Sequence, residues 1–201
     1  MAVSAFTISR LSVVALLLVA CSKKEGDGPD TNAASNSRGT DTSAIGATPS
    51  APGTWTDANI FAVLDEANVA DSTAGALAAT KGTSSAVRDF GKRMTRDHHR
   101  LRAQAESLAK KLKTTPAPPP DDNLVSDSQK HMDTLNSTAK GKDFDKAYID
   151  GEVEVHKKVL ELTTKAFGQA QSTELKNLIQ KAAPVITGHL DLAESIQKNL
   201  K

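Results

Sequence analysis

Cysteine and aromatic residues are scarce in this sequence of 201 residues. A single cysteine, Cys21, excludes an intrachain disulfide framework and a cysteine-based zinc site. Aromatic side chains make up 3% of the residues, fewer than the packing of β-sheets usually draws on. Alanine, leucine and lysine, which are strong helix formers, abound instead. The composition therefore predicts an all-α protein.

The sequence also lacks an excess of either charge, with 25 basic and 24 acidic side chains. Nucleic-acid-binding proteins usually carry a basic stripe or a high pI, so we expect no nucleic-acid partner. Neither the nucleophile elbow of hydrolases nor a glycine-rich phosphate loop occurs in the sequence. These absences favour a non-catalytic module, with a hydrolytic enzyme as the most distant alternative.

The first twenty residues have the layout of a secretory signal. One basic side chain, Arg10, precedes an apolar run from Leu11 to Val19. That run is shorter than the roughly 20 residues that a membrane-spanning helix needs. The letters LVAC, which end at Cys21, resemble a bacterial lipobox. The resemblance implies cleavage before Cys21 and lipidation of that residue, which would anchor the chain to a membrane. An ordinary signal peptide with a spare thiol is the alternative.

Ser22 follows Cys21 at the place where an aspartate would argue for retention in the inner membrane. By that analogy we expect the periplasmic face of the outer membrane as the location. Residues 22–53 are rich in Gly, Ser, Thr, Asn, Asp and Pro, and they bury too little apolar surface to offset the entropy of ordering. We therefore predict a lipoprotein signal peptide at 1–20, a lipid-anchored disordered tether at 21–53 and a helical-bundle domain at 54–201.

Beyond the tether, apolar residues recur at steps of three and four, which is the spacing of amphipathic helices. The pattern predicts four long helices and a short one, over residues 56–80, 84–113, 124–135, 144–167 and 173–201. Thr54 or Thr56 is available to cap the first helix and Ser172 the last, while Gly82 ends the first. Long helices with short or moderate connections predict an up-down four-helix bundle with an extra short helix.

Three of the five histidines, His98, His156 and His189, fall on the inward seams of three different helices. With a rise of about 1.5 Å per residue, His156 and His189 differ in level by only about 5 Å. His98 lies near the middle of its helix, so all three can share one layer. His99 lies about 100° further around the helix and should point outward. We expect His131 to be exposed too, because its helix is poorly apolar.

Acidic side chains occur near this histidine layer. Glu152 precedes His156 by one turn on the same face, and Asp97 adjoins His98. A mononuclear metal site can be drawn from His98, His156, His189 and Glu152, because neutral imidazoles and a carboxylate suit iron, zinc or copper.

A structural polar layer is the alternative to a metal site. In it the histidines and their polar neighbours satisfy one another by hydrogen bonds and need no ion. We assign four further residues to this layer: Asp71, Asp97, Asp145 and Tyr148. Along the helices, Asp71 lies about 7 Å from the level of His98. Either arrangement buries neutral histidines, so the domain should loosen below about pH 6.

Three segments, VRDFGKRMTRDHHRL, FDKAYIDGEVEVHKKVLEL and LIQKAAPVITGHL, resemble the ferritin-like bundles of domain-of-unknown-function family 4142. The resemblance covers about Trp55 to Leu200. Its most specific residues are Asp97-His98, Phe144-Asp145 with Tyr148, His156 and His189. It implies a ferritin-like four-helix fold in a periplasmic or outer-membrane protein of bacteria, and it supplies no established reaction. Asp71 occupies a place where family members often carry glutamate.

Ferritin-like di-iron sites need a Glu-x-x-His step on each of two helices, and the sequence has none. A di-iron oxidase is therefore not predicted. Two functions remain. The first is an envelope lipoprotein that binds an unidentified envelope partner or acts under stress, which the anchor, the tether and the missing active-site motifs favour. The alternative is a metal-binding or redox protein that holds one transition-metal ion in the inward histidine–carboxylate layer.

Overall fold

The computed structural model describes residues 53–120 and 122–200, and the regular structure within these ranges is entirely α-helical. The predicted signal peptide, the lipidation site at Cys21 and nearly all of the predicted tether lie outside the described residues. Within the described ranges, no helix combines the length and the apolar character that crossing a membrane requires.

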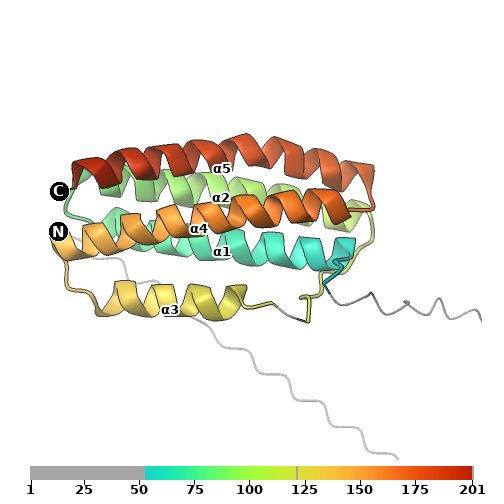
Figure 1. Ribbon diagram of the computed structural model, residues 1–201, viewed down its shortest axis with the longest axis horizontal. Helices are drawn as coiled ribbons and strands as arrows, with labels where there is room; N and C mark the ends of the chain where they lie inside the picture. Colours follow the sequence, from blue (N-terminus) through green and yellow to red (C-terminus); the bar gives the residue numbers. More distant parts are fainter. Residues whose placement is uncertain (1–52, 121, 201) are drawn as a thin grey trace, which may run out of the picture. The chain divides into compact units, whose positions relative to one another are not determined.

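Five helices follow one another along the described chain (Figure 1). They are α1 (Asp57–Lys81), α2 (Ser85–Lys111), α3 (Leu124–Ser137), α4 (Lys142–Gln169) and α5 (Thr173–Asn199). The prediction of an all-α bundle with four long helices and one short helix is confirmed, and the predicted ends lie close to the observed ones.

Residues in the connections set the ends of the helices. The Thr56 hydroxyl accepts a hydrogen bond from the Asn59 backbone N–H at 3.3 Å, and the Asn59 side chain accepts one from the Thr56 backbone N–H at 2.9 Å. This reciprocal pair is a capping box. Ser172 caps α5 by accepting from the backbone N–H of Leu175 at 3.2 Å. Gly82 ends α1. Of the two possible caps in the sequence, Thr54 and Thr56, the structure therefore has Thr56.

The bundle consists of two antiparallel helix pairs, α1 with α2 and α4 with α5 (Figure 1). Between them α3 runs back along α1 and α4 and returns the chain to the end at which α2 began. As a result α4 is parallel to α2. The Asp145 carboxylate near the start of α4 accepts hydrogen bonds from the backbone just before α2. One crossover between two helix pairs is the connectivity of ferritin-like bundles.

The interior has two apolar clusters with buried polar residues between them. One cluster gathers around Phe61, Leu101 and Ile179, and the other around Phe90, Phe144 and Ile196. Both include residues of α1, α2, α4 and α5. Eight of the ten buried polar residues in the described ranges fall between these clusters, along all four long helices. They are Asn68, Asp71, Ser72, Asp97, His98, Glu152, His156 and His189.

Two glycines let α1 and α2 approach closely beside this polar layer. A Cβ placed on Gly91 would lie 2.5 Å from the Gly75 carbonyl oxygen, and one on Gly75 would lie 2.7 Å from the Gly91 carbonyl oxygen. Real Cβ atoms do not come that near to backbone oxygen, so any larger residue would push the helices apart. Gly75 is one helical turn from Asp71, and Gly91 is two turns from His98. The glycine contact therefore helps to set the spacing between those two side chains.

Candidate metal centre

Three histidine rings from three helices meet in the middle of the bundle. His98 on α2 is 2% exposed, and His156 on α4 and His189 on α5 are 0% exposed. The ring centroids are 5.2 Å apart for His98–His189, 5.5 Å for His156–His189 and 5.8 Å for His98–His156. One ligand nitrogen from each ring lies within 4.8 Å of the other two. Two ligands on opposite sides of one ion are about 4 Å apart, so small side-chain rotations would suffice to close on an ion.

Hydrogen bonds fix the proton position on two of these rings. His156 Nδ1 donates to the Glu152 backbone carbonyl at 2.9 Å. His189 Nε2 lies 3.1 Å from Asp97 Oδ2 and donates to that carboxylate. Because a carbonyl and an ionised carboxylate only accept, each of these nitrogens carries the proton of its neutral ring. The opposite nitrogen of each ring, His156 Nε2 and His189 Nδ1, is left with a lone pair.

His98 is held by an asparagine that the sequence analysis did not single out. His98 Nδ1 lies 3.0 Å from Asn68 Oδ1. The Asn68 amide nitrogen donates to the Leu64 carbonyl at 2.6 Å, so its oxygen is the atom that faces the ring. The proton therefore lies on His98 Nδ1, and Nε2 has the lone pair. In the sequence, the only sign of Asn68 is that this amide directly follows Ala67, which belongs to the apolar pattern of the first helix.

The three lone-pair nitrogens have no hydrogen-bond partner among the described residues. His98 Nε2, His156 Nε2 and His189 Nδ1 are each fully buried and unpartnered. Metal-binding histidines show the same division, in which one nitrogen binds the ion and the other donates to a carbonyl or carboxylate that orients the ring. All three rings therefore have the tautomer and the orientation of metal ligands.

Two carboxyl groups complete the cluster. Asp71 Oδ2 lies 3.5 Å from His98 Nδ1, and Glu152 Oε2 lies 3.4 Å from His156 Nδ1. Neither oxygen has a hydrogen-bond partner among the described residues. Asp71, Glu152 and His156 form a second group of ligand atoms within 4.8 Å of one another. His156 belongs to both groups, so nitrogen and oxygen ligands adjoin. Asp71 lies nearer to His98 than their difference in level along the helices predicted. That prediction took no account of helix tilt or of side-chain length.

Burial favours the uncharged forms of Glu152, His189 and His98. It raises the pKa of Glu152 well above its usual value, and the neighbouring Asp71 adds to the effect. It lowers the pKa of His189 to about 4, although the hydrogen bond to Asp97 acts in the other direction. It also lowers the pKa of His98, against the influence of Asp71. A bound divalent cation would change the state of the carboxyl group alone, since it favours an ionised carboxylate and keeps the imidazoles neutral.

Asp97 connects the cluster with the solvent-exposed side of α2. Its carboxylate lies 3.5 Å from Arg93, 3.1 Å from Arg96 and 3.6 Å from Arg100. Burial alone would raise the pKa of Asp97, but hydrogen bonds from His189 and Arg96 outweigh it and the pKa is lowered. Asp97 is therefore the ionised partner that holds the His189 ring.

Tyr148 and Asp145 were both assigned to the polar layer from the sequence, but only Tyr148 lies beside it. Tyr148 is 0% exposed and lies one turn from Glu152 on α4. Burial raises the pKa of its phenol, and the charge of Glu152 adds to that. Asp145 lies outside the layer and instead accepts from the backbone N–H groups of Thr83 at 2.8 Å and Ser84 at 2.7 Å. It is seven residues before Glu152, about 10 Å along the helix, and so it reaches the start of α2 instead.

Of the two remaining histidines, His99 is exposed as predicted and His131 is not. The His131 ring is partly buried and lies against the backbone of α4 at Gly151, where any Cβ would overlap ring atom Cε1. Its Nε2 is buried and has no partner among the described residues. The prediction that His131 is exposed, which rested on the low apolar content of α3, was therefore wrong. A glycine on the facing helix leaves room for the ring.

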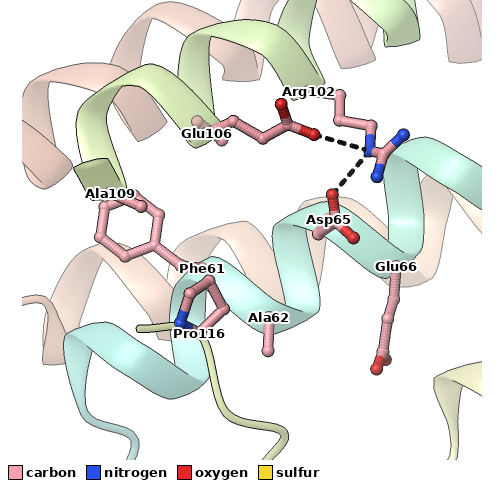
Figure 2. Close-up of a pocket in the computed structure, with 9 residues that line it drawn as sticks. Phe61, Ala62, Asp65, Glu66, Arg102, Glu106, Ala109 and Pro116 are labelled. Carbon is pink, nitrogen blue, oxygen red and sulfur yellow. Dashed lines mark hydrogen bonds and ion pairs between the residues drawn. The ribbon is translucent and has the colours of Figure 1, made fainter. Parts of the chain in front are cut away.

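A wider hollow lies on the surface between α1 and α2, away from the histidines (Figure 2). It has a volume of about 300 Å³, and Phe61 and Pro116 form its apolar side. Arg102 Nε lies 2.6 Å from Asp65 and 3.3 Å from Glu106. Both carboxylates therefore already have Arg102 as their partner. We assign no site to this hollow.

The family model described as Domain of unknown function (DUF4142) matches residues 42–196. The chain belongs to this family, as the resemblance noted in the sequence implied. No curated protein and no solved structure matches the chain.

Proposed function

We propose that the bundle is a transition-metal-binding module, which holds one divalent ion between His98, His156 and His189 with Glu152 as an oxygen ligand. The observation that carries this proposal is the set of buried lone pairs. In a structural layer the polar groups would satisfy one another. Here three ring nitrogens and the Glu152 Oε2 oxygen are buried without partners among the described residues. Each such group costs about 1–3 kcal/mol, and one ion bound by the three rings would satisfy the three nitrogens. The Glu152 oxygen lies in the adjoining group with Asp71 and His156, which brings a carboxylate beside that ion.

The ligand set supports a first-row transition ion such as iron, zinc or copper. Imidazole nitrogens suit these metals, whereas calcium and magnesium prefer sites made of oxygen ligands. Asp71 Oδ2 is a further oxygen beside the same histidines. Asn68 and Asp97 would orient the rings from outside the ligand set. Because burial favours protonated Glu152, binding of an ion would displace that proton, and affinity should rise with pH.

Cobalt(II) titration of the full-length chain, purified in mild detergent and stripped with a chelator, tests this proposal. We expect visible absorption bands that saturate at one ion per chain. The His156→Ala variant should bind cobalt at least about 100-fold more weakly than the native chain. Loss of a residue that only orients a ligand already lowers metal affinity by up to about 100-fold, and loss of the ligand itself should cost no less. His99→Ala is the matched control, because His99 is exposed and its loss should change nothing. A native chain that binds no cobalt would contradict the proposal.

We further propose that this module is lipid-anchored through Cys21 on the periplasmic face of the outer membrane. The support is in the sequence: the short apolar run, the letters LVAC and the serine that follows Cys21. Fractionation of cells that express the native chain and Cys21→Ser is the test. Membrane association that the substitution abolishes would support the anchor, and a native chain in the soluble fraction would contradict it. The envelope partner stays a prediction.

A further inference from the structure

A small cavity separates α3 from the candidate metal centre. It has a volume of about 60 Å³, and its lining includes Asp71 of α1, His131 of α3 and Lys158 of α4. That volume is room for about two water-sized groups. Asp71 also lines a second void, on the side of the bundle where His98 lies. One buried carboxylate therefore contacts both the cavity beneath α3 and the histidine cluster.

His131 presents a free ligand atom at this cavity. Its Nε2 is buried and has no hydrogen-bond partner among the described residues. Burial lowers the pKa of His131, while the charge of Asp71 acts in the other direction. The ring is therefore neutral at pH 7 and has a lone pair available. The facing residue is Gly151, which leaves the ring the space to lie against α4 beside Glu152.

The helix above the cavity is attached less firmly than the four long helices. Only its two ends are anchored by buried residues, Leu124 and Leu135. On the solvent side, Lys158 Nζ and Asp127 Oδ2 form an ion pair at 2.7 Å, and the two side chains are 50% and 45% exposed. Exposed ion pairs contribute little to stability. Segments with few buried apolar contacts open locally at low cost in free energy.

The two directions along the bundle axis are less favourable to an ion. Along the bundle axis, the apolar clusters around Phe61 and Phe90 close both ends. A partly dehydrated cation in either cluster would find no ligand, which is costly. Beneath α3, by contrast, an imidazole nitrogen and a carboxylate oxygen are available in sequence.

We propose that a divalent transition-metal ion reaches the centre through the cavity beneath α3, held first by His131 and Asp71 and then passed to the site formed by His98, His156, His189 and Glu152. Asp71 lines this cavity and also lies 3.5 Å from His98, so the ion can exchange its waters for protein ligands stepwise along this path. His131 serves as a transient ligand and is not part of the final set. This inference rests on the proposed metal-binding function.

Stopped-flow uptake of cobalt(II) by the full-length, chelator-stripped chain is the test. His131→Phe keeps a flat ring against Gly151, and His131→Gln keeps a polar side chain, but neither has an imidazole nitrogen. Both should slow uptake about tenfold, which corresponds to about 1.4 kcal/mol in the barrier. The final stoichiometry and the visible spectrum should stay as in the native chain. His99→Gln is the matched control and should take up cobalt at the native rate.

Each other outcome overturns the inference. Native or faster uptake in either His131 variant would show that the ring is not on the path of the ion. A changed final spectrum in both would make His131 a ligand of the resident site instead. Failure of the native chain to bind cobalt at all would remove the metal function itself, and that result differs from intact binding with unchanged kinetics.

Discussion

Acidification of the metal-free protein should destabilise it through His189, by an amount that follows from the pKa of that ring. The ring is 0% exposed, and burial lowers its pKa from 6.5 to about 4. Between these values the unfolded chain binds more protons than the folded chain, so the free energy of unfolding falls as the pH falls. At pH 4 the loss that this ring contributes is about 3 kcal/mol.

Other groups of the cluster titrate over the same range. His98 also has a lowered pKa and acts in the same direction as His189. Glu152 acts in the opposite direction, because its raised pKa makes the folded state the stronger proton binder above about pH 4.5. The stability of the native chain alone therefore mixes opposing contributions. The His189→Gln variant removes the contribution of this ring, while His98 and Glu152 are retained.

The assay is urea unfolding followed by circular dichroism, at pH 7 and pH 4, with a chelator present throughout. The native chain should exceed His189→Gln in free energy of unfolding at pH 7, and this advantage should shrink by about 3 kcal/mol at pH 4. An advantage that does not change with pH would refute the reasoning. It would mean that the His189 ring is accessible to protons in the folded protein, and so not in a closed layer.

Three further predictions concern the surroundings of the centre. Gly91→Ala should force α1 and α2 apart, because the added Cβ overlaps the backbone of α1. The overpacking should destabilise the fold by about 1–3 kcal/mol, against about 1 kcal/mol of stabilisation from the higher helix propensity of alanine. We expect a lower melting temperature and weaker cobalt binding, and unchanged values of both would contradict the prediction. Asp145→Ala should cost about 1–2 kcal/mol by leaving two backbone donors at the start of α2 without their acceptor, measured by urea unfolding, while cobalt affinity stays native. Glu152→Gln should make metal-free stability fall less between pH 5 and pH 8 than in the native chain, because the variant lacks the buried carboxyl group whose pKa is raised. The same fall in melting temperature between these pH values in both proteins would argue against a raised pKa.

The fold was predictable because its signals are local. The three- and four-residue apolar spacing marked each long helix, and Thr56, Gly82 and Ser172 marked helix ends that the structure confirms. The inward position of His98 and the outward position of His99 followed from the same helical phase. A residue's phase on its own helix depends on nearby sequence alone, which is why this level of prediction succeeded.

The parts of the site that were not predicted depend on contacts between helices. His131 was expected to be exposed, and its burial depends on Gly151 of a different helix. Asp145 faces inward as its phase requires, but the partner it meets is the backbone before α2. Asn68 became relevant only through its contact with His98. Helical periodicity gives the direction of a side chain, whereas its partners depend on how the helices cross.

Metal content tests the central claim most directly. The full-length chain is expressed with its own N-terminal segment, purified without chelator or nickel affinity resin, and analysed by elemental mass spectrometry beside a His156→Ala/His189→Ala variant of equal helicity. We predict close to one iron, zinc or copper ion per native chain and none in the variant. A native chain without metal, together with a variant of clearly lower stability, would contradict the metal centre and leave the histidines as a structural layer.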